Sequence, residues 1–319
     1  MGVSEPQTSA AFASAPDVAD RLRSVGYLPD DRIAATVYLG ARLEKPVLVE
    51  GPAGTGKTEL AKSVAALTGA RLVRLQCYEG LDEAKALYEW DYRKQLLRIQ
   101  AGAAYSGLGG QADGQAAGVD QAGEGWTAVE DDIFGEHYLL TRPLLAAIRS
   151  AEPVVLLVDE VDRLDVETEA LLLEVLSDYQ VSIPELGTLT ARQRPLVFLT
   201  SNNSRELSEA LKRRCLYLHL DYPSPARERD IVLSRVPGVG ERLAGRVAEV
   251  VRSLRGLELK KRPSVSETLD WARTLVILGA DDVDTALVVD HLPVLLKHQT
   301  DIELATRELT GKKLGSRSA

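Results

Sequence analysis

The chain has 319 residues, enough for one large domain and a second, smaller one. Hydrophobic residues make up 45% and charged residues 27%, which is an ordinary globular balance. The formal net charge of −9 argues against nucleic acid as the main partner, because neutralising phosphates requires a basic surface.

The N-terminal residues 1–17 are rich in Ser, Ala and Pro and lack both the basic start and the apolar run of a signal peptide. We expect them to form a disordered tail. No segment approaches the roughly 20 apolar residues that a membrane span needs. We therefore expect a cytoplasmic protein without a membrane span.

The first half of the chain predicts strands alternating with helices. A helical stretch over residues 17–43 precedes a short apolar strand at 46–50, and a glycine-rich segment then opens an amphipathic helix that reaches residue 67. Another strand is predicted at 71–77. Residues 79–130 form an insertion: its first part, to residue 99, has a helical pattern, and the Gly- and Ala-rich residues 101–127 predict a mobile loop.

The second half contains the most apolar strand, at 153–158, followed by a helix for which Asp165 is the predicted N-cap. A hairpin is predicted at 181–190, with further strands at 195–200 and 216–220. After Pro223-Ser-Pro225 the pattern is helical. These elements predict an α/β domain over residues 18–222, in which helices cover both faces of a parallel sheet. A small all-α lid domain at 223–311 and a frayed tail at 312–319 follow.

A phosphate-binding loop is predicted between the first strand and its helix. The segment fits the pattern G-x-x-x-x-G-K-[ST], in which backbone amides wrap phosphates and the helix N-terminus adds a favourable dipole. We expect Lys57 to contact the β- and γ-phosphates of ATP, and the Thr58 hydroxyl to bind Mg²⁺. The pattern consists of Gly51, Pro52, Ala53, Gly54, Thr55, Gly56, Lys57 and Thr58.

Two acidic residues, Asp159 and Glu160, end the apolar strand at 153–158. Parallel strands present ligands at their carboxyl ends, so Asp159 is expected to face the Mg²⁺ beside Thr58. Glu160 is then placed to act as the general base that activates water. Without the glycine-rich loop, the same pair would indicate only a solvated strand end.

Asn202, after the strand at 195–200, is a candidate for holding the attacking water or the γ-phosphate, although an Asn-Asn pair is also a common turn. Lys212-Arg213-Arg214 ends the next helix. Such a cluster often only stabilises the helix C-terminus. Its functional interpretation is an arginine finger, supplied by Arg214 or Arg213, that acts on the ATP of a neighbouring subunit.

The order of these motifs resembles that of the AAA+ ATPases, with the glycine-rich loop as Walker A, Asp159 and Glu160 as Walker B, and Asn202 at the sensor-1 position. Further segments resemble the MoxR family and, within it, the CoxD-like branch, over residues 18–280. They are Leu75-Gln-Cys-Tyr-Glu-Gly-Leu-Asp82, the insertion through Trp90, Ile183-Pro-Glu-Leu-Gly187, Thr200-Ser-Asn-Asn203, Ala210-Leu-Lys-Arg-Arg-Cys215 and Ser266-Glu-Thr-Leu-Asp-Trp-Ala272.

This resemblance implies a homo-oligomeric ring, a hexamer, with ATP and Mg²⁺ at each interface. It also implies a chaperone-like ATPase with a partner that carries a von Willebrand factor A domain. The resemblance to this branch also implies the clients, which are carbon monoxide dehydrogenase and related molybdenum hydroxylases. The ATPase is expected to help mature the metal centre of these enzymes. Two other functions stay open: a nucleic-acid motor or loader, and a regulatory switch that binds ATP without turnover.

One position departs from the AAA+ pattern. Many members have a sensor-2 arginine in a Pro-Ser-x-Arg stretch of the second domain, whereas this chain has Ser266 there. Lys260, Lys261 or Arg262 is a candidate substitute, and a basic surface turn explains these residues equally well. The sensor-2 role is therefore left unassigned.

Overall fold

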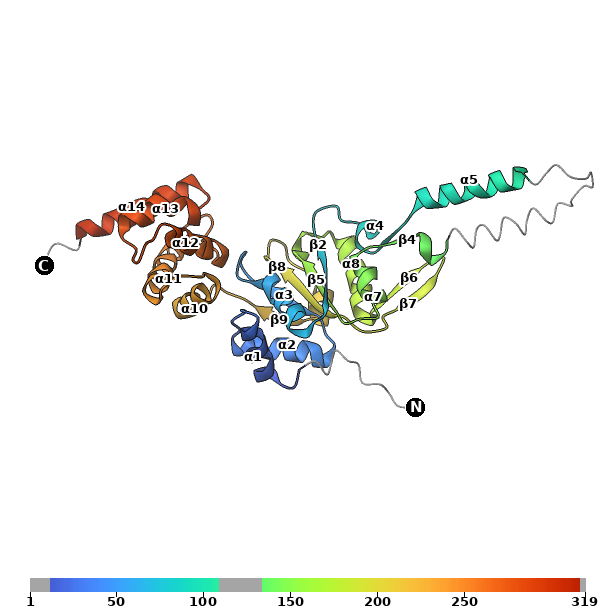
Figure 1. Cartoon of the computed structure of the whole chain (residues 1–319), viewed down its shortest axis with the longest axis horizontal. Coiled ribbons are helices and arrows are strands. Elements are labelled where there is room, and N and C mark those ends of the chain that lie inside the picture. The colour runs from blue at the N-terminus through green and yellow to red at the C-terminus, as the bar shows by residue number, and fades with distance from the viewer. Residues whose placement is uncertain (1–11, 109–133, 316–319) are drawn as a thin grey trace, which may run out of the picture.

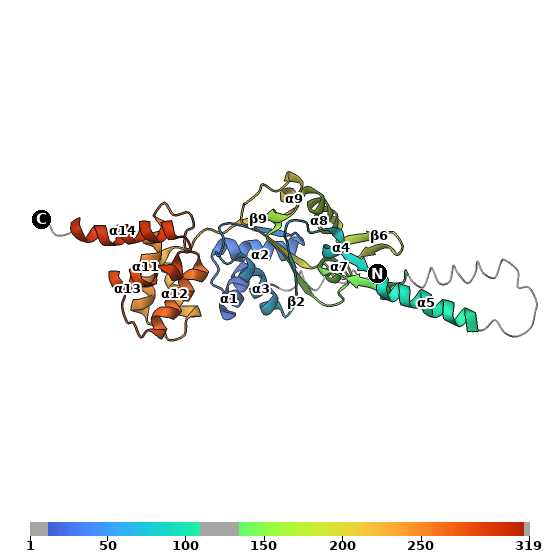
Figure 2. The same ribbon diagram turned by 90° about the horizontal axis from the view of Figure 1, so that it is seen from above.

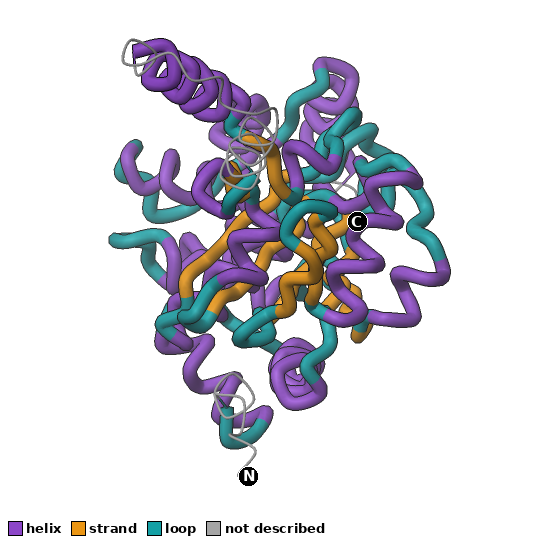
Figure 3. The backbone as a smooth tube through the Cα atoms, turned by 90° about the vertical axis from the view of Figure 1, so that its right-hand side faces the viewer, coloured by secondary structure: helices purple, strands orange, loops and turns teal. Residues whose placement is uncertain are grey.

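A five-stranded parallel sheet forms the centre of the protein, as the computed structural model shows for residues 12–108 and 134–315 (Figures 1 and 3). The strand order is β2-β5-β8-β1-β9, and every neighbouring pair is parallel. All five predicted strands are confirmed, and their carboxyl ends meet at one edge of the sheet. They are β1 (Val47–Glu50), β2 (Arg71–Gln76), β5 (Val154–Asp159), β8 (Leu196–Ser201) and β9 (Leu216–His219).

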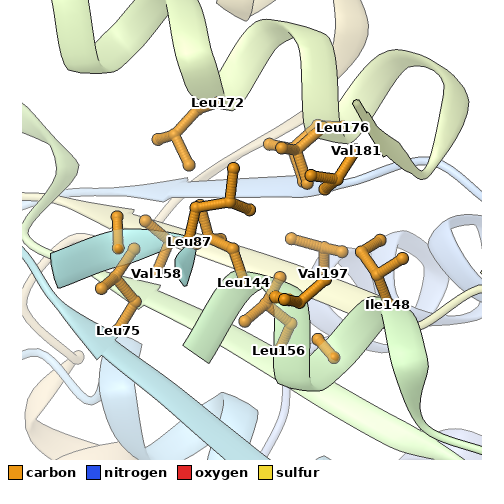
Figure 4. Packing of buried hydrophobic residues seen from close by; sticks show 14 of the residues in the cluster. Leu75, Leu87, Leu144, Ile148, Leu156, Val158, Leu172, Leu176, Val181 and Val197 are labelled. Carbon is orange, nitrogen blue, oxygen red and sulfur yellow. The ribbon is translucent and has the colours of Figure 1, made fainter. Parts of the chain in front are cut away.

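Helices cover both faces of this sheet because alternate residues of its strands point to opposite sides. Val155 and Leu157 of β5 pack on one face with helices α1, α2 and α3. Leu156 and Val158 pack on the other face with α7, α8 and the hairpin β6–β7 (Figure 4). The helices are α1 (Ala15–Ser24), α2 (Asp31–Leu43), α3 (Lys57–Thr68), α7 (Pro143–Arg149), α8 (Val166–Asp178) and α9 (Glu209–Arg214).

The N-terminal segment differs from its prediction in two respects. The predicted tail reached residue 17, but α1 begins at Ala15 and Phe12 is buried in the core of the first face. Residues 1–11 lie outside the described part. The helical stretch predicted for 17–43 is two helices, because the chain turns at Gly26, which has a φ of 79°. The connection between α1 and α2 lines a cavity described below.

The insertion contains α4 (Glu83–Ala86), β3 (Tyr88–Trp90), α5 (Tyr92–Leu108) and, after a short 3₁₀ turn at Glu136–Tyr138, β4 (Leu139–Thr141). Strands β3 and β4 pair antiparallel. Helix α5 extends away from the body in two perpendicular views (Figures 1 and 2). It continues to Leu108, so the start of the loop predicted at 101–127 is helical, and residues 109–133 lie outside the described part. The predicted hairpin is confirmed as β6 (Gln180–Ile183) and β7 (Gly187–Thr190).

The C-terminal part is a helical bundle with its own apolar core, separate from the two cores around the sheet. Its first helix begins at Pro225, within the Pro223-Ser-Pro225 segment at which the sequence predicts the start of the lid. The predicted frayed tail begins inside the last helix, and residues 316–319 lie outside the described part. Within the described ranges, no helix is long and apolar enough to cross a membrane. The helices are α10 (Pro225–Arg235), α11 (Glu241–Arg255), α12 (Val265–Ile277), α13 (Thr285–Leu295) and α14 (Gln299–Gly315).

A buried ion pair joins three parts of this lid. Both carboxylate oxygens of Glu228 accept hydrogen bonds from the Arg255 guanidinium, at 2.6 and 2.8 Å. The Thr268 hydroxyl donates to the same carboxylate at 2.8 Å, and Arg255 Nε donates to the carbonyl oxygen of Pro263. The pair thereby holds the start of α12 against α10 and α11.

We predict that Glu228→Ala lowers the free energy of unfolding by about 3–5 kcal/mol, because Arg255 is left as a buried charge without its carboxylate. Urea denaturation followed by circular dichroism measures this change. Glu249→Ala, which breaks an exposed ion pair with Arg246 on α11, is the control and should cost less than about 1 kcal/mol. Equal losses in the two variants would contradict the structural role of the buried pair.

Candidate active site

The predicted phosphate-binding loop lies between β1 and α3, at the carboxyl edge of the sheet. Gly54 and Gly56 have φ values of 73° and 94°, which favour glycine over residues with a side chain. At Gly51 there is no room for a side chain, because a Cβ atom there would lie 1.9 Å from the carbonyl oxygen of Leu220. The loop is thus a backbone cradle whose glycines are required by its geometry.

Lys57 begins α3 and is buried, with 6% of its surface exposed. Its ammonium donates to the carbonyl oxygens of Gly51 and Pro52, at 2.7 and 2.8 Å, and to Oδ1 of Asn202 at 2.8 Å. Burial lowers the pKa of Lys57, and the nearby carboxylates oppose this shift. The structure therefore brings together Lys57 and Asn202, which were predicted to share one site.

Asp159 ends β5 and is buried at 3% exposure. Its Oδ1 accepts hydrogen bonds from the hydroxyl groups of Thr58, at 2.9 Å, and Thr200, at 2.5 Å. Its Oδ2 lies 2.5 Å from the guanidinium of Arg74. The predicted pair Thr58 and Asp159 is in contact, and a hydroxyl beside a carboxylate is a donor set that suits Mg²⁺.

Glu160 follows Asp159 in the left-handed backbone region, with a φ of 59°. A residue other than glycine is rarely held there, and such strain is concentrated at functional sites. The backbone N–H of Glu160 donates to the Thr200 hydroxyl at 2.9 Å, which fixes this geometry. The Glu160 carboxylate forms an ion pair with Arg163 at 2.7 Å.

Asp162 organises the segment that carries Asn202. Its Oδ2 accepts hydrogen bonds from the backbone N–H of Asn202 at 3.2 Å, and from both the backbone N–H and the hydroxyl of Ser204, at 2.9 and 2.5 Å. Burial alone would raise the pKa of Asp162, but these hydrogen bonds outweigh burial and lower it below 3.8. The charged carboxylate is thus the form that holds Asn202 over Lys57.

The basic cluster at the end of α9 lies elsewhere. Arg213 and Arg214 are exposed, and neither lines the cavity around Lys57 in its own chain. Arg214 donates to the Ser177 hydroxyl and to the carbonyl oxygen of Ala210. The structure therefore does not bring these two arginines together with the other predicted site residues of the same chain.

Two cavities adjoin the glycine-rich loop. The smaller one, of about 230 Å³, is lined by Lys57, Thr58, Asp159, Glu160 and Asn202, among others. The larger one, of about 760 Å³, lies between the lid and the connection between α1 and α2, and its walls include Tyr27, Leu28, Ile231 and Leu269. A small polar cavity next to a larger one with both apolar and charged walls fits the phosphates, metal and base of a nucleotide.

The lid reaches this site directly. The backbone N–H of Val265 donates to the carbonyl oxygen of Gly54 at 3.1 Å, and Arg235 forms an ion pair with Glu59 of α3. Ser266, at the position where a sensor-2 arginine was sought, lines both cavities. Lys260, Lys261 and Arg262 line neither cavity, so the structure offers no support for them as substitutes.

Sequence reasoning missed three residues of the site. Thr200 is named only as the end of a strand and the start of the segment Thr200-Ser-Asn-Asn203, Arg74 lies within a predicted strand, and Asp162 is not singled out. Thr200 was the most accessible to prediction, because a hydroxyl at the carboxyl end of a strand next to Asn202 indicates the same edge of the sheet. Arg74 carries no such signal.

The fold and the site define a nucleotide-binding α/β protein with a glycine-rich phosphate loop and a helical lid. A family model described as "AAA domain (dynein-related subfamily)" matches residues 46–215, just over half of the chain. The chain belongs to this family.

Two curated proteins resemble the chain. One is "Protein NorQ" of Paracoccus denitrificans (strain Pd 1222), 25% identical over 245 residues, which cover 74% of this chain and 75% of the relative. The other is "ATPase family gene 2 protein homolog B" of Bos taurus, 39% identical over 69 residues, or 22% of this chain. The chain spans only 9% of the length of this bovine relative.

Solved structures of RuvB from Thermotoga maritima are also similar to this chain. One of them, a point mutant, is 18% identical with a TM-score of 0.45, and the match covers 91% of this chain and 73% of RuvB. Another, described as the RuvB Holliday junction branch migration motor, is 16% identical with the same TM-score, covering 90% and 73%. This likeness concerns the fold alone.

We predict that Asp162→Asn lowers the free energy of unfolding by about 1–3 kcal/mol at pH 7, because the amides of Asn202 and Ser204 lose a charged acceptor. The pKa of Asp162 is lowered by folding, so its contribution is complete above the unfolded value of 3.8 and is lost as the pH falls through the folded value. Urea denaturation is measured from pH 7 down to about 3. The difference in the free energy of unfolding between wild type and Asp162→Asn should become smaller below pH 3.8.

Asp178→Asn serves as the control, since this carboxylate is exposed at the end of α8. Its stability should stay within about 0.5 kcal/mol of wild type at every pH. If the stability difference between wild type and Asp162→Asn grows as the pH falls, the charged Asp162 carboxylate is not the group that stabilises the segment of Asn202 and Ser204.

Proposed function

We propose that this protein hydrolyses ATP with Mg²⁺ at the interfaces of a homo-oligomeric ring. The observation that carries the proposal is the convergence of Lys57, Thr58, Asp159, Glu160 and Asn202 on one cavity at the carboxyl edge of the sheet. The family supports an ATPase, and the name of the bovine relative agrees.

The residues divide the work by their chemistry. The loop from Gly51 to Thr58 binds phosphates through its backbone N–H groups, and Lys57 neutralises their charge. Thr58 and Asp159 would hold Mg²⁺, which would supply positive charge to neutralise the charge that develops on the phosphates. Once the Glu160 carboxylate has separated from Arg163, it accepts the proton of the attacking water. Asn202 orients that water.

The charges of the smaller cavity support the proposal of a ring. Lys57 is the one cationic side chain among its described lining residues, which also include Glu59, Asp159 and Glu160. In the transition state, negative charge is spread over the oxygens of the transferred phosphoryl group, and a cationic side chain in addition to the proposed Mg²⁺ would stabilise it. Arg214 or Arg213, exposed and remote from the cavity of its own chain, is suited to reach the site of a neighbouring subunit.

We further propose that the protein is a MoxR-type remodelling chaperone of the CoxD-like branch that assembles as a hexamer. On this proposal it works with a von Willebrand factor A domain protein and assists the maturation of a metalloenzyme, such as a molybdenum hydroxylase or carbon monoxide dehydrogenase. The sequence segments that resemble the MoxR family support this step. The similarity to Protein NorQ, which extends through about three quarters of both chains, shows that the likeness to known proteins is not confined to the phosphate-binding loop.

We predict that Glu160→Gln lowers the rate of ATP hydrolysis by about 10²–10⁴-fold while nucleotide affinity changes little, because the amide cannot accept the proton of water. Lys57→Ala should lose nucleotide binding itself. Hydrolysis is followed by phosphate release and binding by a fluorescent ATP analogue. Wild-type turnover in the Glu160→Gln variant would favour a different base, and absent turnover in assembled wild-type protein would favour the ATP-binding switch.

We predict that Arg214→Ala assembles like wild type but hydrolyses ATP about 10³-fold more slowly, because the finger acts across the interface. Specific activity of wild type should rise with protein concentration, in step with assembly measured by light scattering. Arg213→Ala is the matched variant, and the one that loses activity identifies the finger. If activity is independent of concentration and neither variant is impaired, the composite site is wrong.

A further inference from the structure

A cation outside the predicted nucleotide motifs neutralises the buried Asp159. Arg74 Nη2 lies 2.5 Å from Asp159 Oδ2 and also donates to the side-chain oxygen of Gln76. The other carboxylate oxygen is held separately, by the hydroxyl groups of Thr58 and Thr200. The Asp159 side chain is 4% exposed, whereas that of Arg74 is 47% exposed.

The geometry of the sheet explains why Arg74 reaches this carboxylate. Gln76 is paired in register with Asp159 on the neighbouring strand, and Arg74 lies two residues earlier on the same face of β2. Such diagonal neighbours are about 7–8 Å apart, within reach of an arginine side chain. Because β2 is the edge strand of the sheet, no further strand of the described chain covers Arg74 on its outer side.

We propose that Arg74 is an internal counterion of Asp159. Arg74 competes with a divalent cation for the Asp159 carboxylate and thereby weakens metal binding until nucleotide phosphates are present. The inference rests on the proposed function, in which Thr58 and Asp159 hold the metal of the bound nucleotide. Arginine suits this role because its guanidinium remains charged at every pH the protein experiences.

Two opposing effects decide what the loss of Arg74 does. The guanidinium repels a second cation on the same carboxylate, so its removal should strengthen metal binding. It also helps to orient the carboxylate, so its removal should weaken metal binding. Thr58 and Thr200 still hold Oδ1 when Arg74 is absent, so orientation is largely kept. Repulsion between a single and a double charge at a partly exposed site should dominate and change metal affinity by about tenfold.

The test is metal binding rather than turnover. Mn²⁺ substitutes for Mg²⁺, and its free concentration is read from its electron paramagnetic resonance signal, with the full-length protein both nucleotide-free and saturated with ADP. The variants are Arg74→Gln, which removes the charge, and Arg74→Lys, which keeps it. Arg71→Gln is the matched control, because it removes an exposed arginine from the opposite end of the same strand, where Arg71 pairs with Val154.

We expect Arg74→Gln to bind Mn²⁺ about tenfold more tightly than wild type, with the larger gain in the nucleotide-free protein, where no phosphates attract the metal. Arg74→Lys and Arg71→Gln should stay within about threefold of wild type. Unchanged or weaker Mn²⁺ binding in Arg74→Gln overturns the proposal, and so does an equal gain in Arg71→Gln, which would indicate a general effect of net charge.

Arg74 is half exposed, so its variants should fold, and circular dichroism checks this. Should Arg74→Gln not fold, Arg74→Met removes the charge with a side chain of similar length and takes its place. The proposed function fails in a different way: wild-type protein would then not bind fluorescent ADP in the presence of Mn²⁺. ADP binding with identical Mn²⁺ affinities in wild type and Arg74→Gln would reject only the role of Arg74.

Discussion

The buried carboxylate of Asp159 is the constraint around which the site is built. It lies at the end of the most apolar strand, and a charge buried there is costly unless it is paired and hydrogen-bonded. Its partners come from three elements: Thr58 from α3, Thr200 from β8 and Arg74 from β2. Satisfying this one group therefore fixes the phosphate-binding helix and two strands relative to β5.

The same logic continues along the edge of the sheet. The Thr200 hydroxyl accepts a hydrogen bond from the backbone N–H of Glu160 and donates one to the Asp159 carboxylate, so this one hydroxyl positions both acidic residues. Asp162 then holds the backbone around Asn202, and Asn202 contacts Lys57. These hydrogen bonds form a connected path from β5 through β8 to the phosphate-binding loop. A ligand that displaces Lys57 from Asn202 would break the last link of this path.

Much of the fold could be predicted from the sequence because its signals are local. Apolar runs showed all five strands, and the glycine-rich pattern between a strand and a helix placed Lys57 and Thr58. The order of the strands in the sheet depends on long-range pairing that no local pattern reveals, and this order decides which side chains meet. Arg74 and Asp159 are 85 residues apart in the chain, and only the pairing of β2 with β5 brings them together. The turn at Gly26 was missed because helical periodicity continues on both sides of it.

The lid illustrates a different limit of sequence reasoning. Its pattern predicts helices but does not indicate which of their residues approach the two cavities, and the basic residues closest to Ser266 in the sequence are Lys260, Lys261 and Arg262. In the structure, Arg235 and Arg273 of the lid line the larger cavity instead, while Ser266 lines both. The lid thus supplies cationic side chains to the larger cavity from α10 and α12, outside the basic segment at residues 260–262. The buried pair of Glu228 and Arg255 joins α10, α11 and the start of α12, so the parts of the lid that approach the larger cavity and Gly54 are connected by hydrogen bonds. Through Arg235 and Val265, the lid contacts both α3 and the phosphate-binding loop at the edge of the sheet.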